Sequence, residues 1–264
     1  MLLLPALFLM IVAFVLPVVG MLALSVTGPA GGVTAEQFQR LFSSDFHLNA
    51  AGRALRLSVV QTLATVLLAV PLAYLMARVG PFLRATMLVI VILPLMTSVV
   101  VRTFGWVVLM GPSGLLPALP PFSWFVDRQG LLGTELGIVI AMVQVLLPFA
   151  TLTILGVTSA VKPQLEEAAR TLGAGFWRTL RLIVVPLITP GVVAGAILVF
   201  ALSVSSFVTP RMIGGYQLPV LAGTIYTDAT TNLDWPFAAA QAVVLFLGVM
   251  LVIAAALRMG RTKY

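Results

Sequence analysis

The sequence predicts an all-α membrane protein with six spanning helices. Hydrophobic residues make up 61% of the 264-residue chain and charged residues only 9%, whereas a soluble domain carries about 25% charged residues. The apolar runs are continuous rather than alternating, which favours helices over the strands of a membrane barrel. No water-soluble fold of this length could bury so much apolar surface. We therefore expect lipid to surround one transmembrane domain over residues 1–264.

Six apolar stretches reach the length of about 20 residues that a helix needs to cross a bilayer. They lie near residues 1–26, 54–77, 85–110, 136–161, 184–207 and 236–257. The first is longer than the core of a signal peptide, about 7–15 residues, so we expect a retained helix and leave open a missing cytoplasmic tail. The sixth starts after Asp234, a typical N-cap residue, with Pro236 in its first turn. In the fifth, Gly191 and Gly195 are spaced for close helix packing, and in the third Pro94 should produce a kink.

The distribution of charge predicts the orientation of the spans. If the N-terminus is cytoplasmic, nine of the fifteen Lys and Arg residues but only two of the eight acids lie on the inner side. The basic residues are Arg78, Arg84, Lys162, Arg170, Arg178, Arg181, Arg258, Arg261 and Lys263, and the acids are Glu166 and Glu167. The positive-inside rule then places both termini in the cytoplasm. Trp106, Trp124 and Trp235 fall near the predicted outer ends, where the headgroup layer favours indole rings.

Residues that carry catalytic and metal chemistry are scarce. The chain has no cysteine and one histidine, His47, in a polar stretch that we interpret as a loop. It lacks the G-x-x-x-x-G-K-[ST] loop that binds nucleotide phosphates. The net charge of +7 is explained by membrane topology rather than by nucleic-acid binding. The sequence therefore predicts no metal site and no catalysis by this chain itself, and it disfavours an intramembrane enzyme.

The segment Lys162–Val185, between the fourth and fifth spans, is the longest predicted inner connection. Through the next proline it reads KPQLEEAARTLGAGFWRTLRLIVVP. Pro163 suits the first turn of a helix, and Glu166 and Glu167 follow where the helix dipole favours acids. Gly173 then interrupts the helix. We expect a short helix, a glycine turn and a second short helix on the inner membrane face, although composition alone also fits a surface helix without a partner.

The order of residues in this segment resembles the EAA motif of permease subunits in binding-protein-dependent ABC importers. That motif reads E-A-A, three residues, G, nine residues, and then I-x-L-P. The matching residues are Glu167-Ala168-Ala169, Gly173 and Ile183-Val184-Val185-Pro186. The spacing agrees throughout, and the one departure is Val185 in place of the usual leucine.

Further short motifs resemble the spermidine/putrescine permease subunits of that family, and the resemblance covers roughly residues 55–257. These motifs are Pro94–Ser98, Arg102-Thr103, Thr209-Pro210, Met212–Gly215 and Asp234–Phe237. Related permeases for other organic solutes and for iron share parts of them. The resemblance implies a type I ABC importer permease in the bacterial inner membrane. The implied solute is a polyamine or related small amine, with opines, amino acid derivatives and ferric ion as open alternatives.

The resemblance also implies that the loop is a coupling helix that docks on a cytoplasmic ATPase subunit. The residues assigned to coupling are Glu166, Glu167, Ala168, Ala169, Arg170, Gly173 and Pro186. The implied partners are a second permease in a heterodimer or homodimer, two ATPase subunits that hold ATP and Mg, and a periplasmic or lipid-anchored solute-binding protein. Closure of the ATPase subunits around ATP would open the pathway outward, and hydrolysis would reopen it inward. A stand-alone secondary transporter or channel is the main alternative, although the chain shows no inverted repeat.

Polar residues within the spans are candidates for contact with the solute. Arg102 lies about two-thirds of the way across the third predicted span. It could instead snorkel to the outer interface or pair with Glu135. Thr97, Ser98 and Gln144 could line a path, or they could form hydrogen bonds between helices.

A second group of candidates lies in the predicted external loop from Val208 to Asp234. Tyr226 and Asp228 offer an aromatic face and a carboxylate, which are the groups that a cationic polyamine would need. The alternative is that they act only as a loop cap and a solvated side chain.

Overall fold

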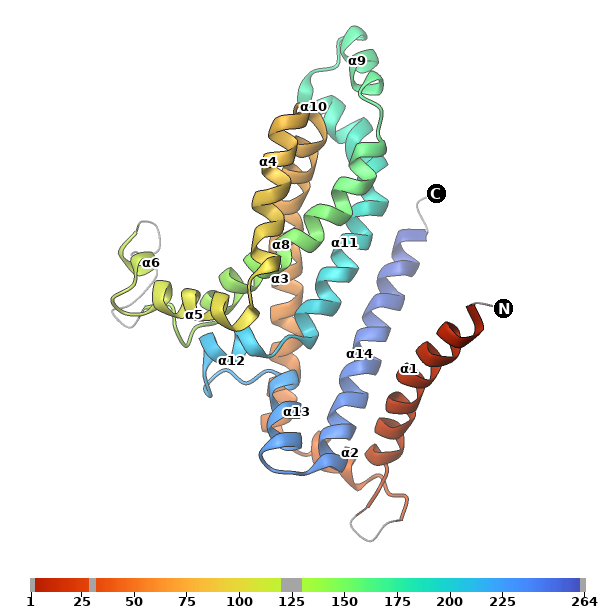
Figure 1. The fold of residues 1–264 in the computed structure, drawn as a ribbon, viewed down its shortest axis with the longest axis vertical. Coiled ribbons are helices and arrows are strands. Elements are labelled where there is room, and N and C mark those ends of the chain that lie inside the picture. The colour runs from red at the N-terminus through yellow and green to blue at the C-terminus, as the bar shows by residue number, and fades with distance from the viewer. Residues whose placement is uncertain (1–2, 29–31, 120–129, 262–264) are drawn as a thin grey trace. The chain divides into compact units, whose positions relative to one another are not determined.

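The computed structural model describes residues 3–28, 32–119 and 130–261, which fold into helices joined by turns (Figure 1). Among these residues, Thr27 and Val33 form an isolated β-bridge. Five helices are long and apolar enough to cross a membrane, and a bent helix pair makes a sixth if it is counted as one span. The predicted all-α membrane fold is therefore confirmed. Trp124 and Lys263, used in the prediction of orientation, lie outside the described residues.

Most predicted spans agree with the observed helices within a few residues. The unbroken spans are α1 (Leu3–Ser25), α3 (Asp45–Arg78), α8 (Glu135–Ala160), the run of α10 (Phe176–Thr179), η2 (Leu180–Val184) and α11 (Val185–Ser205), and α14 (Trp235–Arg261). The predicted start of the second span at residue 54 is wrong, because α3 already begins at Asp45. His47, predicted to lie in a loop, is therefore helical. Asp45 suits the first turn of a helix, and hydropathy detects only the part of a helix that is apolar.

The third predicted span is sharply broken rather than continuous. α4 (Pro81–Ile92) leads into a 3-10 turn, η1 (Leu93–Met96), and α5 (Val99–Met110) then leaves at 98°. Pro94 contributes no backbone donor, and Thr97 and Ser98 have extended ψ angles of 146° and 136°. The Pro94 carbonyl is not left unsatisfied, because Thr97 Oγ1 donates to it at 2.8 Å. The sequence indicated a proline kink here but not a bend of this size.

The chain divides into two compact units, which we describe separately. Residues 1–55 and 219–252 form the first, which contains α2 (Glu36–Phe42) and α13 (Leu221–Thr230) besides α1 and parts of α3 and α14. Residues 56–218 and 253–264 form the second, which includes α6 (Leu115–Ala118), α9 (Gln164–Thr171) and α12 (Val208–Gly214). The prediction of a long loop over 208–234 is wrong, because α12 and α13 make most of that segment helical.

Within the second unit, α8 and α11 lie side by side through small residues (Figure 1). A Cβ atom added at Gly191 would lie 2.7 Å from the Cβ of Val157. At Gly195 it would lie 3.3 Å from Cγ1 of Ile154. Real Cβ atoms do not approach other carbons as closely as at Gly191. The predicted packing role of this glycine pair is therefore confirmed.

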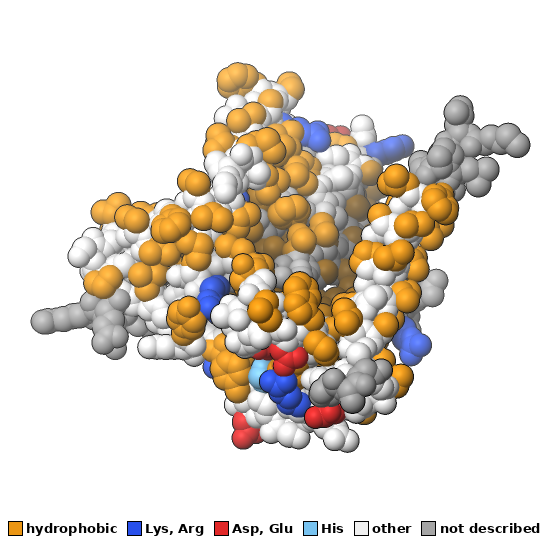
Figure 2. All heavy atoms as spheres, turned by 60° about the horizontal axis from the view of Figure 1, so that its bottom comes forward, with side chains coloured by type: hydrophobic (Ala, Val, Ile, Leu, Met, Phe, Trp, Pro, Cys, Tyr) orange, Lys and Arg blue, Asp and Glu red, His pale blue; other side chains and the backbone are white. Residues whose placement is uncertain are grey.

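Large apolar side chains stay on the surface of the spans, as expected for helices in lipid. On α3, Leu63 and Leu67 are 66% and 74% exposed. Figure 2 shows hydrophobic side chains over much of the visible face, with the charged ones gathered in small groups. This distribution suits a chain surrounded by lipid rather than by water.

Candidate functional site

The segment that carries the EAA pattern forms a helix, a glycine turn and a second helix at one end of the second unit (Figure 1). α9 ends at Thr171, and Gly173 follows with φ +81°, a conformation that favours glycine. The backbone N–H of Ala174 donates to Ala169 O at 3.0 Å and closes the turn. The predicted helix–turn–helix is confirmed, with one correction. The second helix is not separate, because α10 continues through a π-helical turn beside Pro186 into α11.

The helix α9 buries an acidic side chain and exposes apolar ones, which is unusual for a short surface helix. Glu166 and Ala169 are buried, with 6% and 7% exposure. Leu165, Ala168 and Leu172 recur at positions i, i+3 and i+7 and therefore share one face, which is exposed. Leu172 is 88% exposed. An apolar stripe on a short helix that the described residues of its own unit leave uncovered is typical of a docking surface.

Charged residues of α9 divide between the two faces. Glu167 and Arg170 are exposed beside the apolar stripe, so they are available to a partner. Glu166 turns inward, where it accepts hydrogen bonds from Tyr74 Oη at 2.8 Å and from Arg78 Nε at 2.8 Å. The predicted coupling residues thus do not form one surface.

Three of the six candidates for contact with the solute, Thr97, Ser98 and Arg102, lie at the break between α4 and α5. Thr97 and Ser98 are exposed at the break itself. Arg102, in the first turns of α5, donates through Nη1 to Pro94 O at 2.5 Å, and its buried Nε has no hydrogen-bond partner among the described residues. It does not pair with Glu135, which forms an ion pair with Arg56 instead.

Gln144 lies on α8 and takes part in a contact between helices. Trp106 Nε1 on α5 donates to Gln144 Oε1 at 3.3 Å. Another contact between helices joins α5 and α12, where Thr103 Oγ1 and Thr209 Oγ1 lie 3.1 Å apart and both residues are buried. Gln144 therefore serves helix packing in this state, which is one of the two roles that its sequence position allowed.

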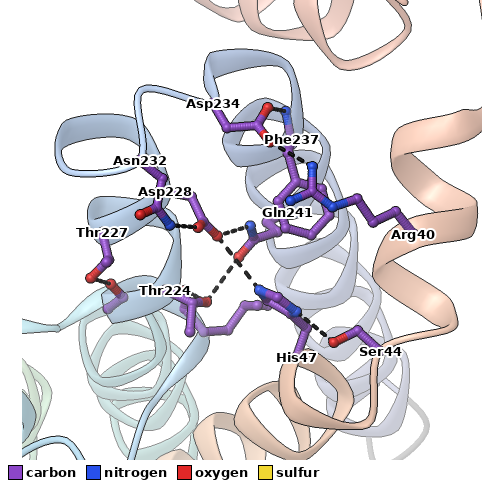
Figure 3. A network of polar contacts seen from close by, with 12 residues as sticks. Arg40, Ser44, His47, Thr224, Thr227, Asp228, Asn232, Asp234, Phe237 and Gln241 are labelled. Carbon is purple, nitrogen blue, oxygen red and sulfur yellow. Dashed lines mark hydrogen bonds and ion pairs between the residues drawn. The ribbon is translucent and has the colours of Figure 1, made fainter.

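In the first unit, Asp228 is the centre of a buried polar network (Figure 3). Its Oδ1 accepts from Asn232 Nδ2 at 2.7 Å, and its Oδ2 accepts from Gln241 Nε2 at 2.6 Å. His47 Nε2 lies 3.5 Å from Oδ2. The carboxylate is only 8% exposed, so Asp228 holds α13, α14 and the start of α3 together. Tyr226, on the same helix, is 52% exposed.

The start of α14 agrees with the sequence. Asp234 Oδ1 accepts from the backbone N–H of Phe237 at 3.2 Å, which is the predicted N-cap. Its Oδ2 also accepts from Arg40 at 2.5 Å, and the Arg40 guanidinium lies 4.1 Å from the centre of the Phe237 ring (Figure 3). Sequence reasoning missed the Arg40, His47 and Arg78 contacts, because each joins residues far apart in the chain.

Comparison with known proteins places most of the chain in one family. Residues 69–261 match the family described as binding-protein-dependent transport system inner membrane component. Over 212 residues the chain is 27% identical to the spermidine/putrescine transport system permease protein PotB of Haemophilus influenzae, covering 80% of this chain and 74% of that protein. It is 34% identical over 172 residues to the molybdenum transport system permease protein ModB of Azotobacter vinelandii, covering 65% and 75%.

The fold also agrees with a solved structure at low sequence identity. A crystal structure of a bacterial ABC transporter involved in the import of the acidic polysaccharide alginate matches with a TM-score of 0.84 and 20% identity. The match covers 99% of this chain and 94% of the other. A structure of the bacterial alginate transporter in complex with its alginate pentasaccharide-bound periplasmic protein matches with a TM-score of 0.83. At this identity the likeness concerns the fold.

Proposed function

We propose that this chain is the membrane subunit through which an ATPase drives solute import. The chain belongs to the family of binding-protein-dependent transport system inner membrane components. It is a multi-pass permease subunit of an ABC importer in the bacterial inner membrane. The observation that carries the coupling role is the exposed apolar stripe of Leu165, Ala168 and Leu172 along α9, which the described residues of the second unit leave uncovered. Both termini then lie in the cytoplasm, on the side of α9.

In the proposed mechanism, α9 passes the movement of the ATPase subunits to the membrane spans. Its apolar stripe would seat in a groove of a cytoplasmic ATPase subunit, with Glu167 at the edge of the contact facing a basic or amide-bearing surface. Closure of two ATPase subunits around ATP and Mg would draw the docked helices together, and the spans would open outward. Hydrolysis would release them and reopen the path inward. This chain contributes no group to the hydrolysis itself.

We further propose that the assembly contains a second permease, most simply a similar one in a heterodimer, and a periplasmic or lipid-anchored binding protein. Our lead solute is a polyamine, and the support is the similarity to PotB over 80% of the chain. Asp228 accepts hydrogen bonds from Asn232 and Gln241 and is buried. Tyr226 is 52% exposed and is therefore the more accessible of the two to a cation.

A second candidate, an anionic solute, is favoured by one observation. Arg102 sits at the break between α4 and α5 with a buried Nε that has no partner among the described residues. A guanidinium in that position would attract an oxyanion and repel a polyamine. The relative named for molybdenum transport is 34% identical over 172 residues, which supports the same reading.

The deciding experiment is solute-stimulated ATP hydrolysis by the purified assembly in proteoliposomes. Binding proteins loaded with spermidine, putrescine or molybdate are added in turn to the outer face. Stimulation by a polyamine-loaded protein supports the lead, and stimulation by the molybdate-loaded one alone supports the second candidate. If no ATPase subunit co-purifies with the permease, the coupling role is contradicted and a stand-alone carrier or channel takes its place.

A further inference from the structure

A cluster of three polar side chains joins α9 to the end of α3 within the second unit. Arg78 Nε donates to Glu166 Oε1 at 2.8 Å, and Arg78 Nη2 lies 2.6 Å from the same oxygen in an ion pair. Tyr74 Oη donates to the other carboxylate oxygen at 2.8 Å. The side chains of Arg78 and Glu166 are only 17% and 7% exposed. Both carboxylate oxygens are thus engaged, which fixes the direction of the Glu166 side chain.

The same cluster reaches the other segments around the glycine turn. Arg78 Nη2 also donates to Val161 O, at the end of the fourth span, at 3.2 Å. The Tyr74 ring lies edge-on to Phe176 of α10, with 6.4 Å between ring centres, and packs against the buried cluster of Val161, Val184 and Ile188. Three segments that flank the turn are therefore held to one end of α3.

Apart from this cluster, α9 buries little side-chain surface against the other described residues of its unit. Ala169 is its buried apolar residue, and its methyl group can contribute only a small contact. The outer stripe of α9 faces away from the protein. A buried ion pair is strongly directional, and loss of one partner leaves an uncompensated charge. The position of α9 relative to α3 therefore depends mainly on Glu166 and its two partners.

We propose that Tyr74, Arg78 and Glu166 form a transmission contact, which makes α9 and the inner end of α3 move as one body. This inference rests on the proposed function, because it requires that an ATPase subunit displaces α9. Displacement of the docked helix would then be passed directly to the second span. Glu166 is a positioning residue in this account, with its role distinct from that of exposed Glu167.

The absence of cysteine from the sequence permits a distance measurement without background labelling. Nitroxide labels are placed at Leu75→Cys on α3 and Gln164→Cys on α9, two exposed positions, in the complete assembly. We expect the distance between the labels to stay the same when a non-hydrolysable ATP analogue is added. In the Glu166→Gln variant we expect it to change or broaden on the same addition.

Transport gives a second readout on the same variants. Glu166→Gln and Arg78→Glu should still bind the ATPase, while solute moved per ATP hydrolysed falls by about tenfold, within the usual range of coupling between sites. The exchanged pair Arg78→Glu/Glu166→Arg should recover most of that loss. The matched control is Arg84→Ala, since Arg84 makes a single exposed hydrogen bond to Ser159 at 3.2 Å and should leave the ratio unchanged.

The outcomes separate the inference from the function on which it rests. Failure of the unmutated chain to bind an ATPase subunit would overturn both. Relative movement of the two labels in a bound, active and unmutated assembly would overturn the transmission contact alone. An unchanged transport ratio in Glu166→Gln, or no recovery in an exchanged pair that binds the ATPase normally, would overturn it as well.

Discussion

The exposed stripe of α9 allows us to predict how much a substitution there should weaken binding of the ATPase subunit. Leu172 is 88% exposed in this chain, so docking in an ATPase groove would remove nearly its whole side chain from water. Burial of a leucine side chain is worth about 1.5–3 kcal/mol. The Leu172→Asp variant loses this contribution and must also desolvate a carboxylate. We expect the Kd for the ATPase subunit to rise by at least about tenfold, since 1.4 kcal/mol corresponds to that factor.

Titration of the purified permease in detergent with labelled ATPase subunit measures this Kd. The matched control is Val33→Asp, because Val33 is 89% exposed but lies in the first unit. Neither substitution should alter the thermal unfolding temperature, since neither side chain is packed. A Leu172→Asp variant that binds the ATPase as tightly as the unmodified chain would refute the assignment of α9 as the docking surface.

Three further predictions concern the spans and the buried network. Gly191→Leu should destabilise the fold by about 1–3 kcal/mol through overpacking against Val157. Gly156→Leu, with open space at its Cβ, should not destabilise it, and thermal unfolding compares the stability of the two variants. Asp228→Ala should lower the free energy of unfolding by about 1–3 kcal/mol, because buried donors lose their acceptor. An unchanged unfolding temperature would contradict a stabilising role of this network. Arg102→Ala should lower the KM for polyamine uptake by removing a like charge. A large rise in this KM would contradict a repulsive effect of Arg102 on a polyamine.

The sequence predicted the spans better than their breaks, and the reason is physical. Continuous apolar stretches identify segments that belong in lipid, and α8 and the fifth span followed closely. The run over 85–110 is equally apolar on both sides of its 98° bend, so composition could not reveal the break. Pro94 marks the position of a weakness in the helix, but the direction of the chain after Thr97 depends on packing in three dimensions.

The turn of the coupling segment was predictable because its determinants are local. Gly173 adopts a positive φ that other residues rarely take, and its place after an alanine-rich helix indicates the end of that helix. The inward direction of Glu166 was not predictable, because its partner Arg78 is 88 positions away. The helical phase offered one signal: Glu166 and Ala169 are three residues apart and so share a face.

The buried polar network around Asp228 shows the same limit of prediction from sequence. His47 and Asp228 each look like an isolated polar residue in the sequence, and a loop was a reasonable expectation for both. The structure places them in helices and brings His47 Nε2 to 3.5 Å from Asp228 Oδ2, while Asp228 accepts hydrogen bonds from Asn232 and Gln241. Polar residues that lie far apart in a membrane chain are therefore better treated as possible pairs than as separate candidates for a solute site.

Site-specific cross-linking from α9 is the most direct test that this helix docks on the ATPase subunit. A thiol introduced as Ala168→Cys, in a chain with no other cysteine, is treated with a short heterobifunctional reagent in membranes that contain the whole assembly. We predict a cross-linked product that contains the ATPase subunit. Tyr216→Cys should give no such product, because Tyr216 is 84% exposed but lies outside the coupling segment. Absence of the product from Ala168→Cys in an assembly that transports solute would contradict docking through α9.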